Sequence, residues 1–249
     1  MRSLTSTSLL VATAATMGLA GVAAGQTVID GGHWDFETAY VNGEWEPHWH
    51  NHTTDTEVDF ADAVLTGNFD GDATGFLAGI DDATPRPAGS QWDFTGAAAG
   101  EDLFVFPASD PQPELVYLGT AAEEVDTDIF VGDTITLEFV GIISAPTGGS
   151  FSKYGFVGGQ PRAYFSSEGD NFTFADNTIQ LNAGSHQHFN WAFTQPGVYE
   201  LAFNASGTLA ADNAFTESGQ FTATFNIVPE PASLGLLGFA GLTLIRRRR

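Results

Sequence analysis

The stretch Phe221-Thr222-Ala223-Thr224-Phe225-Asn226-Ile227 alternates strictly between apolar and polar side chains. Successive side chains of a β-strand point to opposite faces, so this period of two predicts a strand with one buried face. Residues 134–139 and 199–204 repeat the pattern, with an aliphatic or aromatic residue at every second position. These stretches predict β-sheet packed on a hydrophobic core.

Shorter strands are predicted along the rest of the body, at residues 34–40, 58–65, 103–106, 115–118 and 162–166. Turn residues such as Gly148-Gly149 and Gly158-Gly159 separate strands, and no long stretch shows helical periodicity. Many short strands at this spacing predict an all-β fold, an antiparallel β-sandwich of the jelly-roll or Ig-like type. We expect one domain over residues 26–227, with residues 68–100 as a long loop or insertion.

The N-terminus has the features of a secretory signal peptide. Arg2 carries a positive charge, residues 9–24 are almost wholly apolar and small, and Gly21-Val22-Ala23-Ala24-Gly25 offers a cleavage site for signal peptidase. We therefore expect residues 1–25 to be removed during export. The chain contains no cysteine, which excludes disulfides, thiolate metal sites and cysteine nucleophiles.

Residues 228–249 have the layout of a sorting signal. A proline-flanked acid precedes a 14-residue apolar run and a basic end, the signal residues being Pro229, Glu230, Pro231, Arg246, Arg247, Arg248 and Arg249. A helix that spans a bilayer needs about 20 apolar residues, so we expect only a short apolar helix that anchors the chain transiently. The layout resembles the PEP-CTERM signal of Gram-negative bacteria. The resemblance implies an exosortase-type protease as a partner, and a location in the cell envelope or extracellular matrix.

The body between these signals is strongly acidic. Its basic residues are Arg86, Lys153 and Arg162, against 30 acidic residues once Glu230 is set aside from the total of 31. A surface with this charge repels nucleic acid, which we exclude as a partner. Such acidity either keeps an exported protein soluble or attracts divalent cations, and composition does not separate these alternatives.

The six histidines fall in three places: His33, then His48, His50 and His52, then His186 and His188. Residues two apart on a strand share a face, so each group presents imidazoles on one side while Trp49, or Phe189 and Trp191, take the other. Neutral imidazoles suit Zn²⁺ or Cu²⁺, and the six histidines form a metal site if the three places converge. The alternatives are solvated or hydrogen-bonded strand residues, or a site made by His33 and only one of the groups.

The body resembles the choice-of-anchor M domain, an actinobacterial-type surface-anchored repeat. The matching stretches are Gly32-His33-Trp34-Asp35-Phe36, residues 119–139 and residues 185–203, with a looser match at residues 101–118. The resemblance implies a surface protein, in some members linked to metal-type transporters. The family pattern places an acid two positions beyond the second histidine of the His48 group. Here that position is His52, which either replaces a ligand or extends a solvent-facing row.

Sequence patterns for a Ca²⁺ loop, for an enzyme and for sugar binding are weaker. Asn68-Phe69-Asp70-Gly71-Asp72 begins like an EF-hand loop, but Ala73 and Gly79 stand where the loop needs glycine and glutamate, so Ca²⁺ is the less favoured ion. No Gly-X-Ser-X-Gly elbow is present, and adjacent acids such as Glu123-Glu124 point apart on a strand, so we expect no enzyme. Tryptophans such as Trp45 and Trp49 leave two further alternatives, a protein that binds extracellular polysaccharide or a structural matrix protein.

Overall fold

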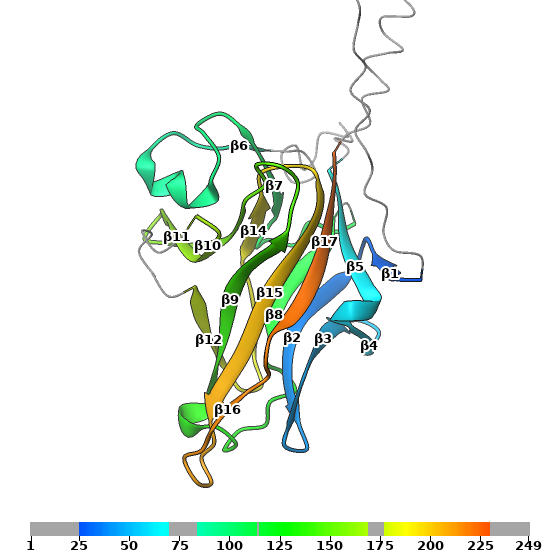
Figure 1. The fold of residues 1–249 in the computed structure, drawn as a ribbon, viewed down its shortest axis with the longest axis vertical. Helices are drawn as coiled ribbons and strands as arrows, with labels where there is room; N and C mark the ends of the chain where they lie inside the picture. The colour runs from blue at the N-terminus through cyan, green and yellow to red at the C-terminus, as the bar shows by residue number, and fades with distance from the viewer. Residues whose placement is uncertain (1–24, 70–83, 114, 169–176, 230–249) are drawn as a thin grey trace, which may run out of the picture.

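The computed structural model describes residues 25–69, 84–113, 115–168 and 177–229. These residues form three sheets and short 3-10 turns (Figure 1). The largest sheet contains, in spatial order, β1 (Thr27–Ile29), β5 (Ala63–Phe69), β17 (Phe221–Pro229), β15 (Gly197–Thr208), β9 (Thr134–Ser144) and β12 (Thr178–Asn182), and β16 (Phe215–Glu217) pairs with β15.

Two five-stranded sheets complete the fold. One contains β11 (Gln160–Ser166), β10 (Phe151–Val157), β14 (Asn190–Phe193), β7 (Asp102–Phe106) and β6 (Thr84–Pro85). The other contains β13 (His186–His188), β8 (Tyr117–Ala121), β2 (His33–Val41), β3 (Glu44–Asn51) and β4 (Thr56–Asp59). The 3-10 turns are η1 (Phe60–Asp62), η2 (Ser90–Thr95) and η3 (Val131–Asp133).

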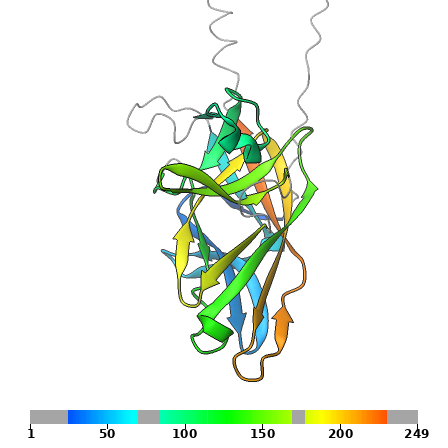
Figure 2. The same cartoon turned by 90° about the vertical axis from the view of Figure 1, so that its left-hand side faces the viewer.

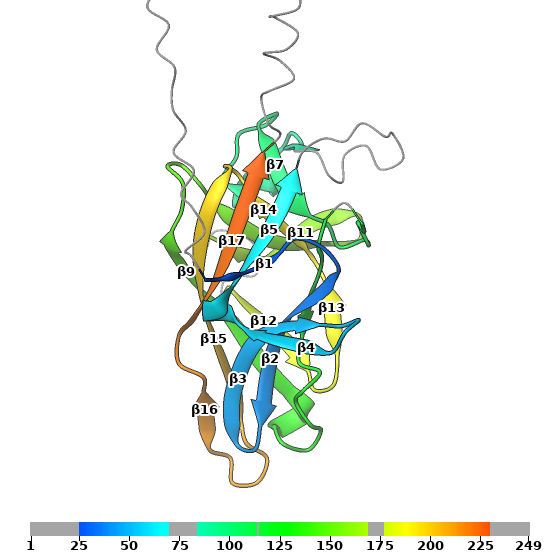
Figure 3. The ribbon, with the colours of Figure 1, turned by 90° about the vertical axis from the view of Figure 1, so that its right-hand side faces the viewer.

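Both five-stranded sheets pack against the seven-stranded sheet over one aromatic core. The ring centroids of Phe36 on β2 and Phe203 on β15 are 4.8 Å apart, and those of Trp191 on β14 and Phe225 on β17 are 5.6 Å apart. Figure 3 shows β5 and β17 side by side above β2 and β3. The described residues are thus a sandwich-like all-β body, as the sequence predicts.

The alternating stretches bury the faces that their patterns predict. Leu137, Leu201 and Phe225 are completely buried, whereas Glu138, between two buried neighbours, is exposed. Strands also form at the predicted stretches 34–40, 103–106 and 162–166. The period of two therefore identifies strands and their core faces correctly.

The prediction of purely antiparallel sheets is wrong. β5 runs parallel to β1 and to β17, and β2 runs parallel to β8. Parallel neighbours need long crossover connections, and β2 and β8 are separated by more than 70 residues. A half-buried strand alternates in the same way in both kinds of sheet, so the pattern carries no information about direction.

Boundaries differ from the prediction in several places. Turn η1 interrupts residues 58–65, and β8 begins two residues after the start of the predicted strand at 115–118. Strands β10 and β12 were not singled out from the sequence. Within residues 68–100, β5 runs to Phe69, and turn η2 buries Trp92 and Phe94 in a small second core with Tyr154. The described part of this segment is therefore structured; residues 70–83, with most of the predicted Ca²⁺ loop, lie outside the described residues.

The turn η2 and the β10–β11 hairpin lie at the opposite end of the molecule from β16 (Figure 2). In the part of the chain that the structure describes, no helix is long and apolar enough to cross a membrane. The predicted signal peptide, apart from Gly25, and the sorting signal from Glu230 onward lie outside the described residues, and Pro229 ends β17.

Candidate metal centre

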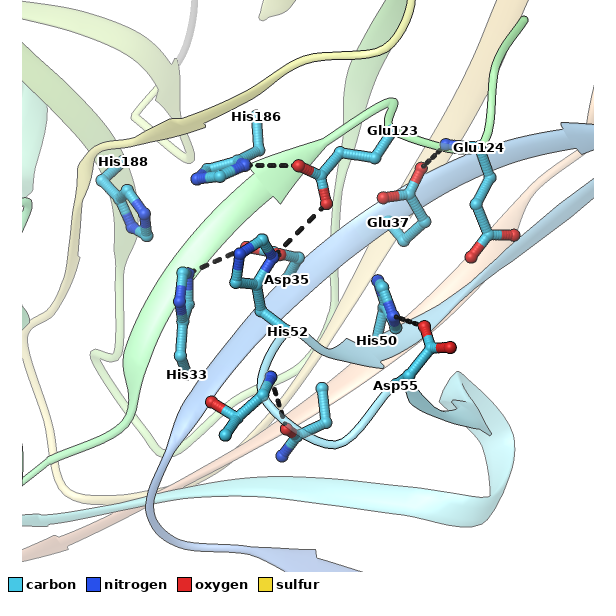
Figure 4. Close-up of polar contacts among 12 residues, drawn as sticks. His33, Asp35, Glu37, His50, His52, Asp55, Glu123, Glu124, His186 and His188 are labelled. Carbon is cyan, nitrogen blue, oxygen red and sulfur yellow. Dashed lines mark hydrogen bonds and ion pairs between the residues drawn. The ribbon is translucent and has the colours of Figure 1, made fainter.

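Four of the six histidines come together on the outer face of the β13-β8-β2-β3-β4 sheet (Figure 4). The ring of His33 lies 4.6 Å from that of His52, 5.7 Å from that of His186 and 5.0 Å from that of His188, measured between centroids. We call these four residues the histidine cluster. His33, His186 and His188 each offer a ring nitrogen within 4.8 Å of the others, a spacing that could hold a metal ion.

Strand pairing brings the cluster together. β8 lies between β2 and β13, with Tyr117 opposite His33 and Gly119 opposite His188. Beyond the end of β3, the backbone N–H of His52 donates to the carbonyl of His33, at 3.0 Å. Residues 33 and 186 are therefore two strands apart in space, although more than 150 residues separate them in the chain.

Two histidines of the cluster have one ring nitrogen fixed by an oxygen acceptor. The Nδ1 of His186 lies 2.6 Å from Glu123 Oε1, and the Nδ1 of His188 lies 3.1 Å from the carbonyl oxygen of Leu118. Because an oxygen acceptor holds the proton on Nδ1, the lone pair is left on Nε2 of both rings. Ligating histidines are commonly oriented in this way by an acceptor behind the ring. Tyr117 stacks on His188 with centroids 3.8 Å apart and fixes that ring further.

Two imidazoles of the cluster, those of His33 and His188, are kept neutral by their surroundings. Burial, together with the neighbouring His188, His52 and His186, lowers the pKa of His33 to about 4. Burial also lowers the pKa of His188, against the opposing effect of its hydrogen bond to Leu118. Since only a neutral imidazole has a lone pair for a metal, both rings are competent ligands at neutral pH.

A buried carboxylate, Asp35, completes the floor of the cluster. Its oxygens lie 3.5 Å from His33 Nε2 and 3.6 Å from His52 Nδ1, and neither oxygen has a hydrogen-bond partner among the described residues. Burial raises the pKa of Asp35 to about 6. Gly119 makes room for this carboxylate, because a Cβ at residue 119 would stand 1.8 Å from Asp35 Oδ1. The site therefore depends on a position without a side chain.

Glu123 connects the cluster to the rest of the face. Besides its bond to His186, its Oε2 lies 3.5 Å from His52 Nδ1. Burial alone would raise the pKa of Glu123, but the hydrogen bond and charge of His186 outweigh it, so the pKa lies below its usual value. Asp35, His52, Glu123 and His186 form a second set of atoms within 4.8 Å of one another. His52 thus joins the cluster, with 42% of its side chain exposed.

His48 and His50 do not join the histidine cluster, so the structure does not bring all six histidines to one point. Both are buried on β3. This strand pairs with β4 on one side and with β2 on the other, where His48 lies opposite Glu37 and His50 opposite Asp35. His52 lies beyond the end of β3 and turns toward His33 instead. A strict row along one strand cannot bring all three rings to one point, because residues two apart stand about 6.5 Å apart.

Sequence reasoning missed the acidic members of this face, Asp35, Glu37 and Glu123. The signal for the first two was present, since His33-Trp34-Asp35-Phe36-Glu37 alternates polar and aromatic residues with period two. Glu123 follows β8 in a turn, and no pattern marks it. Glu123 and Glu124 do contact different histidines, His186 and His48, as adjacent acids that point apart should.

The structure offers no support for a sugar-binding site at Trp45 and Trp49. Trp49 is completely buried, and Trp45 is half-buried, stacks on Phe130 and donates to Thr216 Oγ1, so neither offers a sugar a flat exposed ring. In comparisons with known proteins, no family model and no curated protein matches this chain.

Proposed function

We propose that this chain is an exported, non-catalytic surface protein that binds a divalent transition metal through His33, His186 and His188. The observation that carries the proposal is the convergence of three ring nitrogens within 4.8 Å, from strands far apart in the sequence. Polar side chains at a solvated sheet surface have no need to converge in this way, whereas metal ligands do.

The donor set favours Zn²⁺ or Cu²⁺. Three imidazoles suit both ions, and Asp35 adds an oxygen donor beside them. Glu123 would act behind His186 by holding its Nδ1 proton, which directs Nε2 to the ion. Asp35 Oδ1, Asp35 Oδ2 and His33 Nε2 are buried without hydrogen-bond partners among the described residues, and a cation would satisfy all three.

The sequences of the two termini and the charge of the body support a proposed location. We infer export through an N-terminal signal peptide, and transient anchoring by a PEP-CTERM tail that an exosortase-type protease removes. Lys153 and Arg86 are both buried, which leaves the surface of an already acidic body with still fewer positive charges. Such a surface suits a protein of the cell envelope or extracellular matrix that concentrates cations.

The decisive experiment is calorimetric titration of residues 26–229, which contain every described strand, without a histidine tag. We expect saturable binding of Zn²⁺ or Cu²⁺ by the metal-free protein. The double variant His186→Ala with His188→Ala should lose this binding by 100-fold or more, because it removes two of three imidazole ligands.

The matched control is Gln187→Ala, since Gln187 is the exposed residue between the two histidines on β13. This variant should bind the ion as the wild type does. Absence of saturable binding in the wild type, or equal binding by the double variant, would leave a structural matrix protein as the better description.

A further inference from the structure

A second group of potential ligands lies on the same face, nearer its middle. Glu37 on β2, His50 on β3 and Glu123 after β8 each offer one atom within 4.8 Å of the others. Figure 4 shows Glu123 between His186 and Glu37, with His50 below Glu37 and beside Asp55. We call Glu37, His50 and Glu123 the carboxylate site.

Two of its side chains are buried and incompletely bonded. Glu37 is completely buried; its Oε1 accepts from the backbone N–H of Glu124 at 3.3 Å, but its Oε2 has no hydrogen-bond partner among the described residues. His50 is 9% exposed; its Nε2 lies 3.1 Å from Asp55 Oδ1, and its Nδ1 has no partner there either.

Glu37 Oε2 and His50 Nδ1 cannot form a hydrogen bond with each other when the carboxylate is ionised and the imidazole is neutral. Asp55 holds the proton of His50 on Nε2, so Nδ1 presents a lone pair, and an ionised carboxylate also presents only lone pairs. Two acceptors need a proton or a cation between or beside them. A buried acceptor without a partner is costly, which makes this arrangement unfavourable unless something positive occupies the site.

No basic side chain of the body supplies that charge. Between residues 26 and 229 the sequence contains only Arg86, Lys153 and Arg162. Arg86 pairs with Asp93, Lys153 bonds to Thr120 on the core side of β8, and the Arg162 guanidinium lies over the ring of Tyr164. Unless Glu37 or His50 itself takes up a proton, the compensating charge must therefore come from outside the chain.

We propose that Glu37, His50 and Glu123 form a second divalent-cation site, distinct in its ligands from the histidine cluster. Two carboxylates and one imidazole are a harder donor set than three imidazoles, and they suit Mn²⁺ better than Cu²⁺. The inference extends the proposed function, and Glu123 links the two sites because it also orients His186. The neighbouring set His48, Glu57 and Glu124 is the weaker candidate, since Glu57 is exposed on β4.

The test uses two probes on the metal-free protein. Binding of Mn²⁺ is followed by loss of the electron paramagnetic resonance signal of the free ion, and binding of Zn²⁺ by calorimetry. We expect one Mn²⁺ per chain in the wild type, and the same in the variant His33→Ala with His188→Ala, which disables the histidine cluster. Glu37→Gln should weaken Mn²⁺ binding by 100-fold or more and leave the first Zn²⁺ in place.

Glu44→Gln is the matched control, because Glu44 is an exposed acid at the start of β3, and it should leave Mn²⁺ binding unchanged. The second site is wrong if Glu37→Gln binds Mn²⁺ as the wild type does, or if Mn²⁺ binding disappears with His33 and His188. Saturable Zn²⁺ binding without any Mn²⁺ site would overturn only this inference. Conversely, Mn²⁺ binding without Zn²⁺ binding would overturn only the proposed function. Circular dichroism of each variant shows whether it is folded.

Discussion

Strand β8 lies between two kinds of buried titratable group, carboxylates on one side and an amine on the other. On its outer side lie the carboxylates of Asp35 and Glu37, opposite Gly119 and Ala121. On its core side the Lys153 amine donates to Thr120 Oγ1 at 2.6 Å and lies 4.5 to 5.0 Å from the centroids of three aromatic rings. Among the described residues, neither side supplies a counter-ion of the usual kind, an Arg or Lys for the acids or a carboxylate for the amine.

The two sides resolve this problem differently. Burial lowers the pKa of Lys153 well below its usual value, and a neutral amine still donates to Thr120, so the core side is complete within the chain. On the outer side, by contrast, both oxygens of Asp35 and Oε2 of Glu37 have no hydrogen-bond partner among the described residues. The core side is thus complete with a neutral group, whereas the outer side retains unpartnered acceptors, which is what the cation sites proposed above require.

The largest effect should come from Glu37→Gln in metal-free protein. Burial raises the pKa of Glu37 to about 8, from 4.5 in the unfolded chain. The folded state then binds the extra proton, so the wild type loses stability as the pH rises from about 4.5 through 8. The variant should lack this loss and exceed the wild type by on the order of 3 kcal/mol at pH 9.

Denaturant unfolding in a chelator between pH 5 and 9 measures the difference. Saturating divalent cation should reverse the order of the two proteins, because only the wild type retains the carboxylate for the ion. If the stability of both proteins changes in the same way with pH, Glu37 is not buried as an acid without a partner.

Next in size is Gly119→Ala. The new Cβ would occupy the place of Asp35 Oδ1, so the buried carboxylate must move, and we expect a loss of about 2 kcal/mol in the free energy of unfolding. Zn²⁺ affinity should fall at least tenfold for the same reason. Gly31→Ala is the control, because its Cβ would meet no atom within 4 Å. Calorimetry measures the Zn²⁺ affinity and urea unfolding the stability of both variants. Equal losses in Gly119→Ala and Gly31→Ala would show that the close approach of Asp35 to Gly119 is unimportant.

A smaller gain is expected on the core side. Lys153→Met keeps the length of the side chain and removes the amine, and it should stabilise the protein by about 1 kcal/mol at pH 7. The lowered pKa means that the unfolded chain binds the extra proton, so wild-type stability rises with pH toward the unfolded value of 10.5. The methionine variant should lose that rise. Lys153→Arg, whose charge cannot be released, should be strongly destabilised; equal stability of all three proteins would contradict a neutral amine.

The smallest effect separates members of the histidine cluster. His52 is 42% exposed, and its ring makes no hydrogen bond with the described residues like that of His188 Nδ1 to Leu118. We expect His52→Ala to weaken Zn²⁺ binding less than tenfold, and His188→Ala to weaken it more than 100-fold. Competition with a fluorescent zinc chelator measures the Zn²⁺ affinity of both variants. If His52→Ala weakens binding more than His188→Ala does, the ion is bound nearer Asp35 and Glu123 than we propose.

The positions of the strands could be predicted from the sequence better than the pairing of strands within each sheet. The alternation around Leu137, Leu201 and Phe225 depends only on which face is buried, and it could be read directly. The parallel pairing of β2 with β8 could not, because it depends on contacts between residues far apart in the chain.

The candidate site was predictable in part for the same reason. The polar faces at His33 and at His186-Gln187-His188 follow from local pattern, and the burial of Phe189 and Trp191 confirms the opposite face. Their convergence depends on β8 lying between β2 and β13, with Gly119 at the contact, which no local pattern reveals.

The place of β17 has a consequence for how the chain folds. It is the last of the described strands, yet it lies inside the seven-stranded sheet between β5 and β15. Until residues 221–229 have been synthesised, β5 and β15 each lack a neighbour, and such unpaired edges invite aggregation. Pairing β17 with β5 also closes a loop of about 150 residues, which is typical of slow folding. We therefore expect the sheet to close as a late step, after synthesis of the chain is complete.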